Sequence, residues 1–176
     1  MVIVTADVIT KALAVYSLFP QRMPHEILGA TVRLTLVYNP GAAFGLHLGA
    51  YSRWIFMVLT AGALFILGRL YRSTREGDLL RALAIALVCG GALGNLIDRI
   101  RSAAGVVDFI DVGIGDMRWP TFNVADMAVS IGAFLLAWVL WGDEHADEAG
   151  TPGGDTASKD QASVATSSVS PAGPEI

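Results

Sequence analysis

The sequence predicts an all-α membrane protein with four transmembrane helices, a small extracytoplasmic β-sheet region and a disordered C-terminal tail. Its residues are 53% hydrophobic and its mean hydropathy is +0.54, which is too apolar for an ordinary soluble domain. Four apolar segments have close to the ~20 residues that cross a ~30 Å hydrocarbon core. They cover residues 2–19, 51–70, 79–97 and 122–141. This division predicts a membrane domain over residues 1–142 and a tail over residues 143–176.

The first apolar segment is the weakest, because Asp7 and Lys11 interrupt it. No basic region precedes it and no convincing small-residue cleavage site follows before Pro20, so we do not expect a cleaved signal peptide. Asp7 and Lys11 are four residues apart and share one helix face, where an acid and an amine inside a span should neutralise each other. A structural ion pair and a pair that positions catalytic backbone are both open interpretations.

Arginine density predicts the orientation in the membrane. The short link between the second and third segments is crowded with Arg69, Arg72, Arg75 and Arg81. By the positive-inside rule this link is cytoplasmic, which makes both termini cytoplasmic and places the loops 20–50 and 98–121 outside. Six arginines in or beside these outer loops oppose this assignment, and the dense short link outweighs them.

Residues 143–176 differ in composition from the rest of the chain. They are rich in Ala, Ser, Thr, Pro and Gly, and they carry seven acidic residues and one lysine, a net charge of −6 that leaves +2 on the remainder. With little to bury, this segment should be disordered. Its acidity accounts for the low pI of about 5.2, and nothing in the chain is basic enough to indicate nucleic acid as a partner.

Two segments outside the apolar spans are predicted to be extended. Residues 31–38 alternate between apolar and polar side chains, as in a strand, and a turn at residues 39–41 leads into the small residues of 42–45. Residues 106–112 are β-branched and apolar around Asp108 and Asp111, which indicates an extended segment at the membrane interface. One face of the first strand should consist of Val32, Leu34, Leu36 and Tyr38.

The end of the third span combines small and polar residues. Gly90 and Gly94 form a small-xxx-small face, which lets another helix pack closely. Asn95 and Arg99 are four residues apart on one helix face. An amide such as that of Asn95 is costly near hydrocarbon unless it is hydrogen-bonded.

The last span begins with signals of a helix start. Trp119 suits the headgroup zone, Pro120 suits a helix entry, and Asn123 is a candidate N-cap that puts Asp126 at position N3. Helix capping and a functional role are equally open for Asp126. Asp108 reads either as a loop carboxylate or as a carboxylate that its apolar flanks draw into a low-dielectric site.

Several protease chemistries lack their residues. The chain has no His-Glu-x-x-His motif, and His25, His47 and His145 are scattered in loops and tail, so no histidine within a span serves Ser130 or Cys89 as a base. Cys89 is expected to be a small apolar filler. Carboxylates remain, and two that lie close together share one proton and hydrolyse a peptide bond with an activated water.

Two alternative interpretations give the acidic residues other roles. Gly113-Ile114-Gly115-Asp116 matches the Gly-x-Gly-Asp string of presenilin-type proteases, although a turn explains it here. A membrane carrier with Asp7, Lys11 and Asp126 in a proton path is the second alternative, and it requires acids spaced along the depth of the membrane.

Five motifs in this order resemble lipoprotein signal peptidase, also called signal peptidase II, over roughly residues 5–141. The motifs are Asp7-x-x-x-Lys11, Asn39-x-Gly41-Ala42-Ala43-Phe44, Gly90-Gly91-Ala92-x-Gly94-Asn95-x-x-Asp98-Arg99, Val107-Asp108-Phe109 and Phe122-Asn123-x-Ala125-Asp126. The acidic tail departs from the pattern of the family.

The resemblance implies an aspartic endopeptidase of the bacterial cytoplasmic (inner) membrane, with its active site at the outer face and the cyclic peptide globomycin as an inhibitor. The family cleaves prolipoproteins just before a cysteine that carries diacylglycerol. Asp108 and Asp126 match its catalytic pair. We expect a monomer that contacts membrane lipid and diacylglyceryl-modified prolipoproteins, with no metal, cofactor or nucleic acid. The positions that shape the pocket or support the pair are matched by Asp7, Lys11, Asn39, Gly91, Asn95, Arg99, Asn123 and Ala125.

Overall fold

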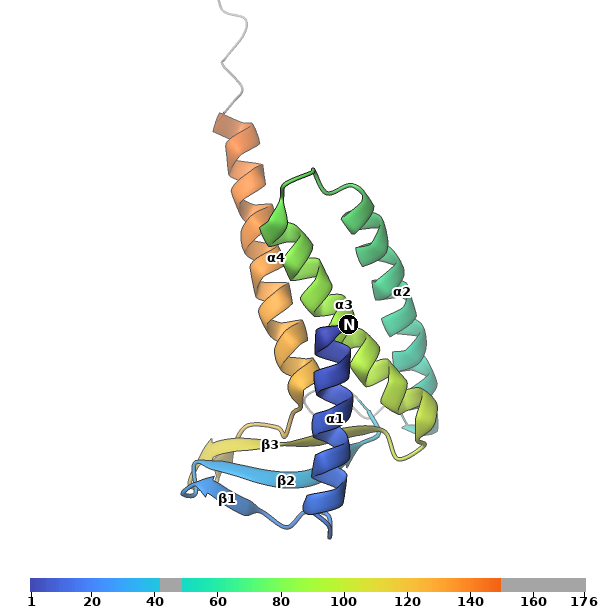
Figure 1. Cartoon of the computed structure of the whole chain (residues 1–176), viewed down its shortest axis with the longest axis vertical. Coiled ribbons are helices and arrows are strands. Elements are labelled where there is room, and N and C mark those ends of the chain that lie inside the picture. The colour runs from blue at the N-terminus through green and yellow to red at the C-terminus, as the bar shows by residue number, and fades with distance from the viewer. Residues whose placement is uncertain (42–48, 150–176) are drawn as a thin grey trace, which may run out of the picture. The chain divides into compact units, whose positions relative to one another are not determined.

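The computed structural model describes residues 1–41 and 49–149 (Figure 1). The chain divides into two compact units, residues 1–141 and 142–176. The helices are α1 (Val2–Ser17), α2 (Ser52–Arg72), α3 (Leu79–Arg101) and α4 (Val124–Ala149), with a short 3-10 turn, η2 (Gly49–Tyr51). The strands are β1 (His25–Leu28), β2 (Val32–Asn39), β3 (Val106–Ile114) and β4 (Met117–Arg118).

Three helices among the described residues are long and apolar enough to cross a membrane. These are Ser52–Arg72, Leu79–Arg101 and the Val124–Asp143 part of α4. Large apolar side chains such as Phe65 and Phe134 are exposed on α2 and α4, as a lipid-facing surface requires. The chain is therefore a membrane protein with at least three candidate spans.

The predicted first span is a helix, but it is not one of those three. Helix α1 has 16 residues, fewer than the ~20 of a full span, and it buries Asp7 and Lys11. A fourth transmembrane helix thus stays a prediction. At the other end, α4 continues to Ala149, so the predicted tail boundary after residue 142 falls inside a helix. The predicted disorder of residues 150–176 lies outside the described residues.

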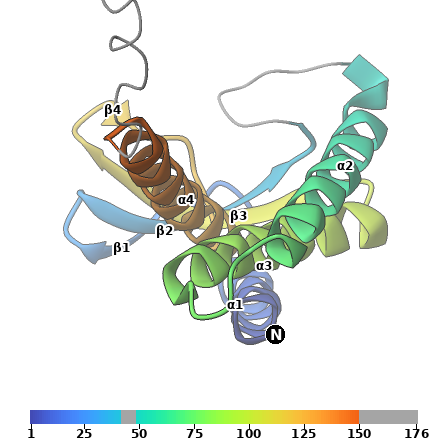
Figure 2. The ribbon, with the colours of Figure 1, turned by 90° about the horizontal axis from the view of Figure 1, so that it is seen from above.

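Helix α3 is the central helix of the first unit. It contacts α1 and α2, and Figure 2 shows α1, α2 and α4 around it. Its glycines permit this close packing, as predicted: a Cβ on Gly90 would lie 3.0 Å from the Cβ of Ile3, and one on Gly94 would lie 2.5 Å from Oδ2 of Asp7. A Cβ on Gly91 would collide with the carbonyl oxygen of Ala125 in α4.

The four strands form one antiparallel sheet in the order β1-β2-β3-β4, which lies across one end of the helices (Figure 1). Both predicted extended segments are strands, because β2 covers most of residues 31–38 and β3 covers residues 106–112. The end of α1 packs on this sheet and forms a small apolar core. Its buried members are Ala14, Leu18, Leu36, Val107 and Phe109.

A β-bulge in β2 corrects the predicted strand face. Leu34 pairs with Ile110 and Val37 pairs with Asp108, so the register shifts between Leu34 and Val37. An extra residue in one strand reverses the faces beyond it. The predicted continuous face through Leu36 and Tyr38 is therefore wrong beyond Leu34.

Candidate active site

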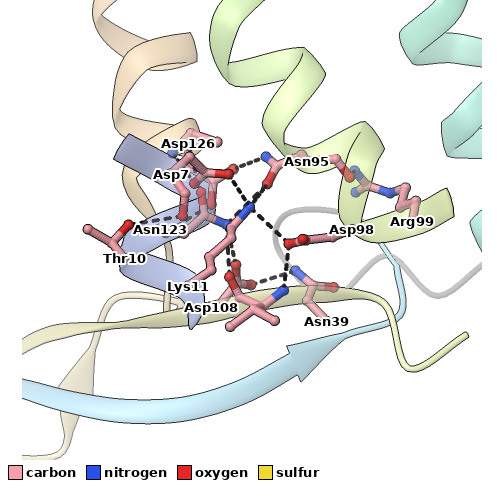
Figure 3. Close-up of polar contacts among 12 residues, drawn as sticks. Asp7, Thr10, Lys11, Asn39, Asn95, Asp98, Arg99, Asp108, Asn123 and Asp126 are labelled. Atoms are coloured by element: carbon pink, nitrogen blue, oxygen red, sulfur yellow. Dashed lines mark hydrogen bonds and ion pairs between the residues drawn. The ribbon is translucent and has the colours of Figure 1, made fainter. Parts of the chain in front are cut away.

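Asp108 is the third residue of β3 and is almost completely buried, with 2% of the residue exposed. Its Oδ1 accepts a hydrogen bond of 2.7 Å from Nδ2 of Asn123, and its Oδ2 accepts one of 3.1 Å from Nδ2 of Asn39 (Figure 3). Of its two sequence-based readings, the structure favours the carboxylate in a low-dielectric site over the solvated loop residue.

The bulge in β2 explains why Asn39 reaches Asp108. Val37 pairs with Asp108 and Asn39 pairs with Val106, and these four residues share one face of the sheet because paired residues and residues two apart point the same way. With the strict alternation predicted from the sequence, Asn39 would point to the other face. The extra residue thus brings an amide donor to the carboxylate.

Asp126 lies in the first turn of α4, where it takes part in a reciprocal cap. Its backbone N–H donates to Oδ1 of Asn123 at 2.9 Å, and its own Oδ2 accepts from the backbone N–H of Asn123 at 3.1 Å. This is a capping box, as predicted. Its other oxygen, Oδ1, accepts a hydrogen bond of 2.8 Å from Nδ2 of Asn95 in α3.

Two amides connect the aspartates. Nδ2 of Asn123 donates to Asp108 and also lies 3.2 Å from Oδ1 of Asn95 and 3.2 Å from the carbonyl of Val107. Asn95 in turn donates to Asp126. The chain Asp108–Asn123–Asn95–Asp126 is therefore continuous, and it joins β3, the start of α4 and the end of α3.

A buried ion pair supports these amides from α1. Nζ of Lys11 lies 2.7 Å from Oδ2 of Asp7, and it donates to Oδ1 of Asn95 at 2.9 Å. Asp7 is fully buried, and its Oδ1 accepts the backbone N–H of Ala125 at 3.0 Å. The interpretation of a pair that positions backbone beside Asp126 is thus favoured over a merely local ion pair.

Arg99 adds a positive charge beside the cluster. Its guanidinium interacts electrostatically with Asp126, Asp108 and Asp98, donates to the carbonyl of Asn95 at 3.2 Å, and lies 5.6 Å from the ring centre of Phe56. A guanidinium that is held in this way is placed to stabilise negative charge at the pair.

Burial and, after it, the negative charge of Asp126 raise the pKa of the Asp108 carboxyl from its ordinary value of 3.8 to about 7. The hydrogen bonds from Asn39 and Asn123 and the charge of Lys11 act in the opposite direction. A carboxyl with this pKa beside a second carboxylate is suited to hold a shared proton at neutral pH.

The structure brings all the predicted site residues together. Asp108, Asp126 and seven of the eight supporting residues take part in the contacts above, and the eighth, Gly91, allows the close approach of α3 to the backbone of Ala125. Gathering the acids at one end of the spans disfavours a proton path through the membrane. The part of the Asn39 motif at residues 42–44 lies outside the described residues.

The remaining candidates lie elsewhere. Asp116 is exposed at the turn between β3 and β4, where Gly115 has a positive φ of 57°, so a hairpin turn accounts for the Gly-x-Gly-Asp string. No group of three His, Cys, Asp or Glu side chains that is placed to hold a metal occurs within residues 1–41 and 49–149.

Asp98 belongs to the third motif, but no role in the site was predicted for it from the sequence. Oδ2 of Asp98 lies 2.9 Å from Nζ of Lys11 and accepts the backbone N–H of Val107 at 3.2 Å. The signal was its position three residues after Asn95, which places both on one face of α3.

Known proteins resemble this chain over most of its length. The family model for signal peptidase (SPase) II matches residues 1–142. A lipoprotein signal peptidase of Burkholderia thailandensis is 40% identical over 141 residues, which are 78% of this chain and 82% of the relative. One of Polynucleobacter necessarius is 45% identical over 106 residues, 58% of this chain and 63% of the relative.

Solved structures also resemble this chain. The structure of a bacterial membrane enzyme superposes with a TM-score of 0.72 at 29% sequence identity, over 88% of this chain and 90% of the other. The matched family model spans α1, α2, α3, the sheet, most of α4 and every residue of the polar cluster described above. The chain belongs to the signal peptidase II family.

Proposed function

We propose that this chain is an aspartic endopeptidase that removes signal peptides from bacterial prolipoproteins, cleaving before the diacylglyceryl-modified cysteine. The observation that carries the proposal is that one continuous pair of amides, Asn123 and Asn95, holds both Asp108 and Asp126. Family membership supports cleavage of a lipoprotein signal peptide, and the two carboxylates supply the chemistry.

In the proposed mechanism the pair holds one proton. Asp108 carries it below about pH 7, because burial and the charge of Asp126 raise its pKa. Asp126 carries the negative charge, which the N-terminus of α4 and the donor Asn95 stabilise. Asp126 then takes a proton from a water that attacks the scissile carbonyl, and Asp108 donates its proton to the carbonyl oxygen.

The placement of the pair suits a substrate anchored in the membrane. Asp126 is in the first turn of a candidate span, and Asp98 and Arg99 are near the end of another. The arginine-rich link between α2 and α3 is at the opposite end of these helices (Figure 1). With that link cytoplasmic, the pair faces the outer leaflet of the inner membrane. We also propose that α1 enters the bilayer, that both termini are cytoplasmic and that the protein acts as a monomer.

The direct test places the purified protein in liposomes and offers it a prolipoprotein as substrate. Cleavage is measured with and without diacylglycerol on the cysteine of that prolipoprotein. We expect only the modified precursor to be cut, with the lipidated cysteine as the new N-terminus by mass spectrometry. No cleavage of the modified precursor, or equal cleavage of both, would contradict the proposed substrate class.

The pKa of Asp108 predicts the pH dependence. Below about pH 7 the pair retains its shared proton; above that, Asp108 ionises and the donor is lost. We therefore expect an alkaline limb in the pH profile: well above pH 7, the cleavage rate should fall by about tenfold for each pH unit. In Asn39→Ala the limb should move to higher pH, because the hydrogen bond from Asn39 lowers the pKa of Asp108. A rate that stays constant to pH 9 would contradict the assignment.

A further inference from the structure

The residue before each aspartate of the pair donates its backbone N–H to another carboxylate, which is itself buried or partly buried. Asp7 accepts the N–H of Ala125, which precedes Asp126, at 3.0 Å. Asp98 accepts the N–H of Val107, which precedes Asp108, at 3.2 Å. One ammonium group, Nζ of Lys11, pairs with both carboxylates, at 2.7 Å and 2.9 Å (Figure 3).

We infer that Asp7, Lys11 and Asp98 form a charged bridge that sets the spacing of Asp108 and Asp126, and that Asp98 is a positioning residue of the reaction. This inference rests on the proposed function. The bridge joins β3 to the start of α4 through α1 and α3. The two backbone segments that carry the catalytic carboxyls are thereby both linked to the ammonium group of Lys11.

The energetics favour a rigid bridge. Lys11 and Asp7 have side chains that are 4% and 0% exposed, and Asp98 is 16% exposed. Two buried charges hold their positions only when they are paired and hydrogen-bonded, and loss of one partner leaves the other uncompensated. The second donor to each carboxylate, a backbone N–H, fixes the direction of the carboxylate. A displacement of about 1 Å between catalytic groups is enough to lower a rate about 100-fold.

Charged groups from α1, α3, β3 and α4 surround this bridge. The end of α3 that carries Asp98 is tied to α2 by Arg53, which donates to the carbonyls of Arg99 and Ile100. When the charge of Asp98 is removed, Lys11 is less neutralised and its effect on Asp108 grows, in the direction that lowers the pKa of Asp108. The charged side chains around the bridge are Asp7, Lys11, Asp98, Arg99, Asp108 and Asp126.

The test compares Asp98→Asn with Asp111→Asn in the full-length protein in liposomes. Asp111 is a matched control, because it is in β3, is 13% exposed and is paired with Arg118 at 2.7 Å. We expect Asp98→Asn to lower kcat at least about tenfold with KM within about twofold, and to move the alkaline limb to lower pH. Asp111→Asn should leave both kcat and the limb unchanged.

Three outcomes would overturn the bridge: wild-type kcat in Asp98→Asn, an unmoved alkaline limb in that variant, or an equal loss in Asp111→Asn. If Asp98→Asn does not fold, Asp98→Glu replaces it. Asp98→Glu keeps the charge but adds a methylene, and we expect folded protein with lowered kcat and unchanged KM; wild-type kcat there also overturns the bridge.

Asp108→Asn, measured in parallel, separates the two proposals. Cleavage that persists in Asp108→Asn contradicts the proposed function itself. Loss of cleavage in Asp108→Asn, together with normal cleavage in the Asp98 variants, contradicts the bridge alone.

Discussion

Asp108→Asn should lower kcat by about 10⁴-fold while the protein remains folded and inserted in the membrane. The amide keeps the shape of the carboxyl but neither holds the shared proton nor passes it to the carbonyl oxygen of the substrate. Asp126→Asn should have a comparable effect, because it removes the base that takes the proton from water. Release of mature lipoprotein in proteoliposomes measures both.

The stability of Asp108→Asn gives an independent check on the same carboxyl. In the folded protein its pKa is about 7, above the ordinary value of 3.8, so the folded state binds the proton more tightly than the unfolded state does. Stability that this group contributes is therefore lost as pH rises toward 7. We therefore expect the difference in melting temperature, Asp108→Asn minus wild type, to be more positive at pH 8 than at pH 5. Differential scanning fluorimetry at the two pH values measures this difference.

Asp116→Asn serves as the control for these variants. Asp116 is exposed in the turn between β3 and β4, so its replacement should leave cleavage unchanged. Normal cleavage in Asp108→Asn would refute the shared-proton mechanism, and loss of cleavage in Asp116→Asn would revive the Gly-x-Gly-Asp alternative.

Local patterns in the sequence predicted much of this fold. Apolar length locates α2 and α3 to within a few residues, and Pro120 and Asn123 announce the start of α4 with Asp126 at N3. These features depend on composition or on neighbours within one helical turn, so a single segment contains the information.

Features that depend on contacts between distant segments were harder to predict. The bulge in β2 reverses the strand face at Val37 and brings Asn39 to Asp108, but a bulge is decided by pairing with β3 and not by the alternation within residues 31–38. The resemblance supplied Asn39 where the pattern alone did not. The length of α4 is a further case, because acidic residues that suggest a disordered tail still continue the helix to Ala149.

The role of Asp98 in the site also depends on contacts between segments that are distant in the sequence. Its spacing from Asn95 places it on the right helix face, but its two partners, Lys11 and Val107, belong to α1 and β3. Only the tertiary structure makes Lys11 common to Asp7 and Asp98. A sequence pattern identifies which polar residues are costly in a membrane; the packing of helices decides which of them meet.

Asn123→Ala should be the most damaging change outside the proposed catalytic pair. Asn123 is fully buried, and its amide donates to Asp108 at 2.7 Å while its Oδ1 caps the N–H of Asp126 at 2.9 Å. Alanine removes the helix cap, which costs about 1 kcal/mol, and leaves buried partners unsatisfied at about 1–3 kcal/mol each. We expect kcat to fall by about 100-fold or more, because both carboxyls lose their common support.

Asn123→Ser separates capping from catalysis. Serine is as good an N-cap as asparagine, so the free energy of unfolding from urea titration should recover in part. Its hydroxyl is too short to replace the amide that joins Asp108 to Asn95, so kcat should stay low. The alkaline limb should also move to higher pH in both variants, because the hydrogen bond from Asn123 lowers the pKa of Asp108. This direction is opposite to that expected for Asp98→Asn, so general loosening of the site does not explain both. If Asn123→Ser restores kcat along with stability, Asn123 acts only as a helix cap.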